Sequence, residues 1–241
     1  MKILVCYICV SKGRQSKYYA ERFISSYHKF RPGFNHSLFV VFNGPNPPKA
    51  LRDVFVGTPH SSMVRTNDGW DIGAYQHVAG GVVYQDLMLC LGESVYFHRP
   101  EWLLRLAEAY DQHGPGMYGL LSSYQLAPHL NTTAFACSPA FIRSYPLVCA
   151  TKGDRYQFEH GVHALWRRVE ASGQAVKFVT WDGEWDQDDW RKPDNILCRG
   201  DQSNLLAFCN HSDNYARAQG DMKRRLADLA DGKIKVKTVA V

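Results

Sequence analysis

The sequence has no apolar run long enough to cross a membrane, and its apolar runs are all short. Its first such run, KILVCYICV after Met1, is about nine residues long and ends at the polar stretch SKGR, whereas a membrane-spanning helix needs about 20 apolar residues. No small-residue cleavage site follows, so the run does not resemble a secretory signal either. We expect a buried first strand, no transmembrane segment and a cytoplasmic location.

Positive charge is also thinly spread. The sequence has 28 Lys and Arg residues and 23 Asp and Glu residues, which gives a net charge of +5. The basic residues form clusters only at Arg167–Arg168 and at 223–225. Nucleic-acid-binding proteins usually carry a dense basic stripe. We therefore expect no nucleic-acid partner, and the balance suits an anionic small molecule such as a nucleoside diphosphate.

A disulfide framework is missing as well. The cysteines number seven, an odd count, and most lie inside apolar runs of a chain large enough to form a core without cross-links. Cys6-x-x-Cys9 has the spacing of a redox pair, but such thiolates are activated at helix N-termini. This pair lies in a strand-like run, so we interpret both residues as core thiols.

The sequence does contain alternating apolar runs and helical patterns, typical of an α/β domain with a mainly parallel sheet flanked by helices. We expect one domain over 1–241. The expected strands are 2–10, 37–42, 63–66, 87–91, 117–122, 133–137 and 176–180, and the expected helices are 18–30, 101–111, 138–145, 158–172 and a C-terminal one at about 213–231. The segment 181–204 has no clear periodicity and is rich in tryptophan and acidic residues.

The turn after the third expected strand carries the first chemical signal. It reads Asn67-x-Gly69-x-Asp71-Ile72-Gly73, which lets the backbone approach a ligand closely at the carboxyl edge of the sheet. Asp71 could accept from sugar hydroxyls, and the amides at the start of the next helix could hold phosphate.

The longer segment Asn67-x-Gly69-x-Asp71-Ile72-Gly73-Ala74-Tyr75 resembles the N-x-G-x-D motif of glycosyltransferases related to rhamnan-synthesis proteins. The order of elements over roughly 1–215 is similar too, and a second similar segment is Phe158–Gly161. The resemblance implies a GT-A (Rossmann-like) fold. It also implies hexosyl or deoxyhexosyl transfer, with inversion, from a nucleotide-sugar donor to a glycan, polysaccharide or lipid-linked acceptor.

The resemblance also assigns the donor side of the site. The loop after the first strand would lie beside the nucleotide, and the end of the second strand would face its base or ribose. The donor-binding residues expected in this way are Ser11, Arg14, Asn43, Asn67, Gly69, Asp71 and Gly73.

The place of the usual metal motif is altered. Such enzymes carry Asp-x-Asp after the fourth strand to hold a divalent metal on the diphosphate, whereas this sequence reads Gly92-Glu93-Ser94. The departing diphosphate still needs a cation or fixed positive groups. Either Glu93 and His211 hold Mn²⁺ or Mg²⁺, or arginines replace the metal; the candidates are Arg14, Arg199 and Arg217.

On the acceptor side, the resemblance makes Glu159 the catalytic base, which we expect at the start of the helix 158–172. Asp154 and Asp182 are the alternatives. His160 and His163 could contact sugar hydroxyls, and Trp181 and Trp185 could pack against sugar faces. The triplet at 131–133 (Asn-Thr-Thr) lines the acceptor side or begins a strand.

Two other functions stay open. The missing Asp-x-Asp would suit a catalytically inactive module that binds nucleotide sugars. A nucleotide or phosphate-ester hydrolase on a doubly wound sheet would need clustered Asp or His ligands, which the sequence does not display.

Overall fold

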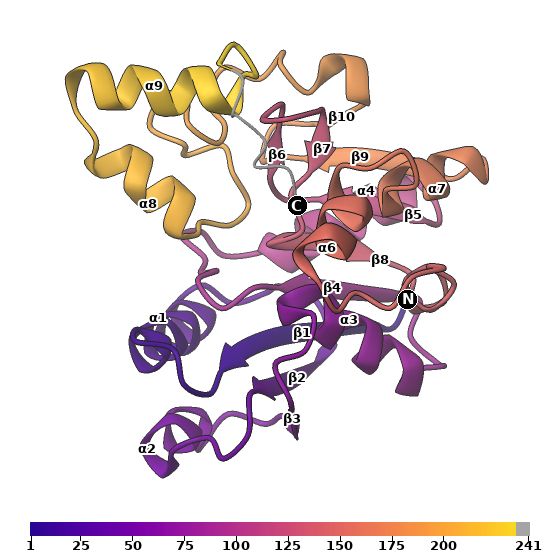
Figure 1. The fold of residues 1–241 in the computed structure, drawn as a ribbon, viewed down its shortest axis with the longest axis vertical. Helices are drawn as coiled ribbons and strands as arrows, with labels where there is room; N and C mark the ends of the chain where they lie inside the picture. The colour runs from indigo at the N-terminus through magenta and orange to yellow at the C-terminus, as the bar shows by residue number, and fades with distance from the viewer. Residues whose placement is uncertain (235–241) are drawn as a thin grey trace.

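The computed structural model describes residues 1–234 and shows an eight-stranded sheet with helices on both faces (Figure 1). The strand order is β10-β9-β5-β8-β4-β1-β2-β3, and β6 and β7 form a separate pair. Neighbouring strands run parallel except where β8 pairs with β4 and β5, and where β10 pairs with β9. The expected α/β domain with a mainly parallel sheet is confirmed, although residues 235–241 of the expected range lie outside the described residues.

The strands have these bounds: β1 Ile3–Val10, β2 His36–Asn43, β3 Ser61–Arg65, β4 Leu87–Leu91, β5 Gly116–Gly119, β6 Ser122–Ser123, β7 His129–Leu130, β8 Ala134–Cys137, β9 Ala175–Val179 and β10 Glu184–Trp185. The α-helices are α1 Ser16–Lys29, α2 Lys49–Arg52, α3 Trp70–Gly81, α4 Trp102–His113, α5 Pro139–Arg143, α6 Lys152–Glu159, α7 Leu165–Ala171, α8 Asn210–Arg217 and α9 Gly220–Ala230. Two short 3₁₀ turns are η1 Asp53–Phe55 and η2 Gln187–Asp189.

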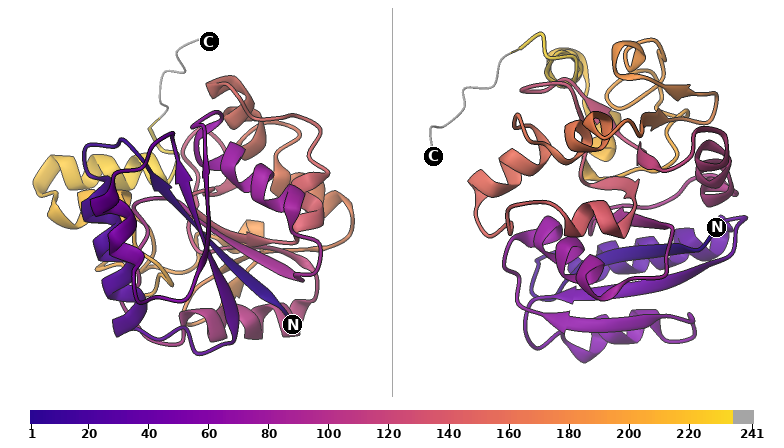
Figure 2. Two further views of the ribbon diagram at one scale, coloured as in Figure 1. Left: turned by 90° about the horizontal axis from the view of Figure 1, so that it is seen from below. Right: turned by 90° about the vertical axis from the view of Figure 1, so that its right-hand side faces the viewer.

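The first strand is central because it is apolar on both faces. Seven consecutive residues of β1 are buried, as a strand covered from both sides requires. Figure 2 shows α1 and α3 on opposite sides of β1. Within this strand, the ring of Tyr7 stacks on the ring of Phe23 of α1, with 3.8 Å between the ring centroids.

Two expected helices were wrong in their extent. The helix expected at 158–172 is divided between α6, which ends at Glu159, and α7, which begins at Leu165. A capping box between Thr151 and Asp154 begins α6 earlier than expected. The helix expected at 213–231 is two helices, because Ala218 leaves the helical conformation and Gly220 has a φ of +53°.

The tryptophan-rich segment 181–204 contains β10 and η2 and is anchored by its rings. Trp190 is fully buried, and its Nε1 donates to the carbonyl of Trp185 at 3.0 Å. Trp181 donates through Nε1 to the carbonyl of Leu205 at 2.8 Å. The segment therefore has a packed structure of its own.

The cysteines behave as core residues. All seven are free and buried, and burial raises the pKa of both Cys6 and Cys9 far above that of a reactive thiol. Among the described residues, no helix is both long and apolar enough to cross a membrane.

Gly69 should be indispensable for the loop that begins α3. Its φ is +70°, and a Cβ there would lie 1.7 Å from the carbonyl oxygen of Cys149. Because left-handed strain alone costs about 1–3 kcal/mol, Gly69→Ala should lower the free energy of unfolding by at least that amount in urea denaturation.

Gly80→Ala, in the same helix, is the matched control. A Cβ at Gly80 meets no atom within 4 Å, so this change should leave stability unchanged or raise it by about 0.4–1 kcal/mol. Equal effects of the two substitutions would contradict the close packing described here.

Candidate functional site

A pocket of about 240 Å³ opens at the carboxyl edge of the sheet, beyond the ends of β1 and β4. It brings together three residues that the sequence singled out, namely Asp71, Glu93 and His211. The remaining lining residues are Val10, Tyr19, Gly92, Ser94, Thr133 and Asn210. Ligands of open α/β sheets bind at this edge.

A hydrogen-bonded clamp positions Asp71. The side chain of Asn43, at the end of β2, is fully buried; its Nδ2 donates to Asn67 Oδ1 at 2.6 Å and to the carbonyl of Trp70 at 3.0 Å. Arg65 Nη1 in turn donates to Asn43 Oδ1 at 2.6 Å. Asn43 and Asn67 thus fix the loop that carries Asp71, a role in addition to the donor contact predicted for them.

The motif glycines have a packing reason. A Cβ at Gly73 would lie 2.3 Å from the carbonyl oxygen of Asp68, and Gly69 is crowded by Cys149 as described above. Both positions exclude larger residues. Their predicted donor contacts stay predictions.

Glu93 is held against β1 by two bonds. Tyr7 donates its hydroxyl to the backbone carbonyl of Glu93 at 2.7 Å, and the backbone N–H of Val10 donates to Glu93 Oε1 at 3.2 Å. A Cβ on Gly92 would lie 3.2 Å from Asp71 Oδ2. The Asp71 carboxylate therefore lies against the backbone just before Glu93, and two carboxylates share one small pocket.

This arrangement makes both carboxylates harder to ionise. Burial raises the pKa of Asp71, and the charge of Arg155 lowers it in part while that of Glu159 raises it further. Burial also raises the pKa of Glu93; hydrogen bonds from Ser16 and from the backbone of Val10 lower it in part, and the charge of Asp71 raises it further. A cation bound between them would reverse this penalty.

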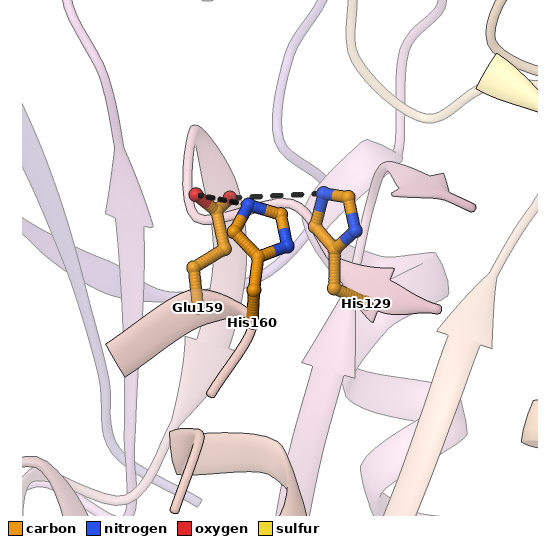
Figure 3. A group of neighbouring side chains, drawn as sticks. All are labelled: His129, Glu159 and His160. Atoms are coloured by element: carbon orange, nitrogen blue, oxygen red, sulfur yellow. Dashed lines mark ion pairs between the residues drawn. The ribbon is translucent and has the colours of Figure 1, made fainter. Parts of the chain in front are cut away.

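Glu159 lies in a second cluster, with His129 and His160 (Figure 3). Its Oε1 accepts from the backbone N–H of Thr132 at 2.8 Å and from the Thr132 hydroxyl at 3.0 Å. His129 Nε2 lies 3.9 Å from Oε1, and His160 Nε2 lies 3.5 Å from Oε2. The exposed fractions of the side chains are 16% for Glu159, 4% for His129 and 11% for His160.

Glu159 was expected at the start of a helix, and this position was wrong. It is the last residue of α6, where the helix dipole disfavours a carboxylate, and the two bonds from Thr132 compensate. Burial lowers the pKa of His160 to about 4, and the neighbouring His129 contributes to that decrease while the charge of Glu159 opposes it.

The two clusters are neighbours across the Thr132–Thr133 segment. Thr133 lines the Asp71 pocket, and Thr132 binds Glu159. Partial burial lowers the pKa of His211, and the charge of Glu159 raises it in part. The triplet at 131–133 thus forms the wall between the pocket and the Glu159 cluster.

Other predicted residues lie apart or are engaged elsewhere. Ser11 donates its hydroxyl to the carbonyl of Gly44 at 2.6 Å, and Arg14 is exposed on the same loop. Arg199 pairs with Asp231, whereas Arg217 is exposed on α8. The two alternative bases serve local structure: the Asp154 carboxylate accepts from the backbone N–H of Thr151 in the capping box of α6, and Asp182 accepts from Thr180 and Asn204.

The predicted acceptor residues are divided among three places. Trp181 and Trp185 line a separate pocket of about 630 Å³ together with Arg99 and Asp182. His163 is exposed beside Arg167, whereas His160 lies with Glu159. The tryptophan pocket shares no lining residue with the Asp71 pocket.

An Asp-x-Asp sequence does occur at 186–188, but at another place in the fold. Asp186 pairs with Lys177 of β9 at 2.7 Å and lines a pocket with Gly173 and Ala175, near the beginning of that strand. Because β9 runs parallel to β5 and, through the antiparallel β8, in the same direction as β4, this is the amino edge of the sheet. The 186–188 carboxylates are thus remote from the Asp71 pocket.

Comparisons with known proteins add weak likenesses. No model of a known protein family matches the sequence, and no curated protein gives a significant match. Among solved structures, S. aureus TarS 1-349 in complex with UDP is 13% identical over 59% of this chain and 48% of that chain, with a TM-score of 0.43. Mouse xyloside xylosyltransferase 1, in the apo form, is 9% identical over 61% of this chain and 70% of that one, with a TM-score of 0.40.

A further similar structure is S. aureus TarS 1-349 in complex with UDP-GlcNAc, at 15% identity, with a TM-score of 0.43. The chain spans about half the length of these TarS chains, 48% and 47% respectively. Likenesses this weak establish no shared activity. The resemblance to rhamnan-synthesis proteins has no matching family model and stays a prediction.

Sequence reasoning missed three residues at the site. His129 lies in a two-residue strand, which has no periodic signal, and Arg155 lies in a helix that began earlier than expected. Thr132 was noted in the 131–133 triplet without its bond to Glu159. The capping pair Thr151 and Asp154 was the available signal for α6, and it would have placed Arg155 on that helix.

The ionised carboxylate of Asp71 should lower the stability of the folded protein at neutral pH in metal-free buffer. A carboxyl group whose pKa is raised by folding stabilises most below its unfolded value, here 3.8, and this contribution is lost as the pH rises through the folded pKa. Asp71→Asn should therefore raise the melting temperature at pH 7, and the difference from wild type should shrink as the pH falls towards 4.

Glu108→Gln is the control, since Glu108 is exposed on α4. It should change the melting temperature little at either pH. A melting temperature of Asp71→Asn below that of wild type at pH 7 would show that Asp71 is instead satisfied in the folded protein.

Proposed function

We propose that the protein is a glycosyltransferase that uses a nucleotide-sugar donor. The observation that carries the proposal is the pocket at the carboxyl edge of the sheet, where Asp71, Glu93 and His211 converge. Such an edge binds nucleotides in open α/β sheets. The N-x-G-x-D resemblance supports the same reaction and a GT-A arrangement.

In this proposal Asp71, Glu93 and His211 hold the divalent metal, Mn²⁺ or Mg²⁺. Carboxylate oxygens suit these hard cations, and Mn²⁺ also accepts an imidazole nitrogen. The raised pKa values of the two carboxyl groups fit a site that binds a cation. When bound, the metal would neutralise charge on the departing diphosphate.

Arginines would supplement that charge rather than replace the metal. Arg155 lies close enough to Asp71 to lower its pKa, and its guanidinium lies 5.2 Å from the centroid of the Trp70 ring. Arg14 is exposed on the loop after β1, beside the predicted nucleotide position. The predicted substitutes Arg199 and Arg217 are the weaker candidates, because one is paired with Asp231 and the other lies on α8.

Glu159 is the proposed acceptor-side catalytic residue. Thr132 fixes its Oε1, its Oε2 faces His160, and the adjacent Thr133 lines the pocket. Removal of the acceptor proton opposite the departing diphosphate would give inversion. The proposed acceptor is a glycan, polysaccharide or lipid-linked sugar, and the proposed location is the cytoplasm.

Loss of Asp71 should weaken donor binding. Asp71→Ala should raise the dissociation constant of the nucleotide sugar by about 1–3 kcal/mol, a factor of about 5 to 150, because a polar or metal-mediated contact is removed. Calorimetry with UDP-, GDP- and dTDP-sugars in the presence of Mn²⁺ would measure this. Asp182→Ala, in the tryptophan pocket, is the control; an unchanged affinity in Asp71→Ala would leave Asp71 a structural residue.

Loss of the Glu159 carboxylate should stop transfer of the sugar without preventing binding of the donor. Glu159→Gln keeps the size of the side chain, so donor affinity should stay within a few fold while transfer to an acceptor is abolished. Release of nucleoside diphosphate would report transfer. A large loss of donor affinity in this variant would remove Glu159 from its proposed role.

The same assays test the alternative of an inactive binding module. That alternative is favoured by Gly92-Glu93-Ser94, which leaves one carboxylate where the resemblance leads one to expect two. Tight donor binding with no transfer to any acceptor and no hydrolysis would support it.

A further inference from the structure

In the cluster of His129, Glu159 and His160, lone pairs face one another without a proton between them. His129 Nδ1 lies 2.8 Å from the carbonyl oxygen of Ala127, and since a carbonyl can only accept, this nitrogen carries the proton. In the neutral ring, Nε2 then presents its lone pair to Glu159 Oε1 at 3.9 Å. Two acceptors face each other across that gap.

The same atoms have the spacing of a metal cage. One nitrogen or oxygen from each of the three side chains lies within 4.8 Å of the others. Ligands held 2.0–2.1 Å from a tetrahedral zinc ion are about 3.4 Å apart. His160 Nε2 lies 3.5 Å from Glu159 Oε2 and His129 Nε2 lies 3.9 Å from Glu159 Oε1, so the carboxylate meets the two rings through different oxygens and would hold the ion through both of them. Figure 3 shows that both imidazole rings turn a nitrogen atom toward the carboxylate of Glu159.

The charge balance of the cluster points the same way. Within residues 1–234, the rings of His129 and His160 are the basic groups within ion-pair distance of Glu159, no Lys or Arg lies that close, and neutral rings supply no positive charge. A largely buried carboxylate needs a cation or several hydrogen bonds. The bond from His129 to Ala127 also matches the outer contact that usually orients a metal-bound histidine.

We infer that His129, Glu159 and His160 bind a divalent transition-metal ion such as Zn²⁺. Two imidazoles and one carboxylate form a donor set that favours such an ion over Mg²⁺ or Ca²⁺. This site is distinct from the Asp71 pocket, whose ligands are mainly carboxylate oxygens. It would tie the β6–β7 hairpin, through His129, to the end of α6.

The ion would also define how Glu159 acts. A cation with three protein ligands keeps an open position, where an acceptor hydroxyl would bind and become more acidic; its proton would pass to the Glu159 oxygen that is less tightly bound to the ion. This step rests on the proposed function, whereas the binding of the ion does not. Glu159→Gln would abolish transfer in either case, so metal binding must be measured directly.

The test is titration of the full chain, freed of metal by a chelator, with Zn²⁺ in a calorimeter. We expect at least one ion per chain, and His129→Gln, His160→Gln and Glu159→Gln should each weaken the tightest binding by at least the 10- to 100-fold seen when outer contacts of metal sites are lost. Circular dichroism would verify that each variant is folded. Should a variant fail to fold, visible absorption of the Co²⁺-loaded wild type decides, since ligation by the cluster gives the intense bands of low-coordinate cobalt.

Two matched controls locate the ion. His163→Gln changes an exposed histidine close to His160, and Glu93→Gln changes the donor pocket; both should bind Zn²⁺ within a few fold of wild type. Absence of saturable binding by wild type, or binding that survives His129→Gln and His160→Gln, or binding lost in Glu93→Gln, would overturn the inference. Failure of nucleotide-sugar binding, with Zn²⁺ binding intact, would instead refute the proposed function alone.

Discussion

The arrangement of the site depends on the placement of two carboxylates, Asp71 and Glu93, in one small pocket. Burial raises the pKa of both groups, and the charge of Asp71 raises that of Glu93 further, as the charge of Glu159 does for Asp71. A folded protein gains nothing in stability from such a pair. The penalty is explained if the pocket receives a cation, since a divalent ion between the carboxylates turns repulsion into binding energy.

The fold maintains this unfavourable arrangement with neutral hydrogen bonds and close packing. Asn43 holds the loop before Asp71 from the end of β2, and Tyr7 and Val10 hold Glu93 from β1. Gly69 lets the loop pack against the backbone of Cys149. Asn43 and Val10 end the strands β2 and β1, and Tyr7 lies within β1, so the sheet positions most of these contacts.

Sequence patterns predicted the strands well and the site in part. Long apolar runs such as β1 and β4 were recognisable because strands buried on both faces are nearly all apolar. Asp71 and Glu93 lie at the sheet edge as expected, because Glu93 closely follows β4 and Asp71 lies at the start of α3, just after the loop that follows β3. The position of Glu159 in its helix was wrong, because the capping box of Thr151 and Asp154 begins α6 earlier than the apolar pattern suggests.

Long-range contacts were beyond sequence reasoning. His129 reaches Glu159 from a two-residue strand, and no local pattern predicts that meeting. Trp181 and Trp185 were predicted to bind the acceptor, but they line a different pocket from Asp71. Their part in acceptor binding stays a prediction, and it would require an acceptor long enough to reach both places.

The most direct test of the central claim is an assay of nucleoside diphosphate release from UDP-, GDP- and dTDP-sugars, with Mn²⁺ and with EDTA, in the presence of candidate glycan acceptors. We predict release from at least one donor that is accelerated by an acceptor, lost in EDTA and restored by Mn²⁺. Absence of both binding and turnover for every donor, in protein shown to be folded, would contradict it.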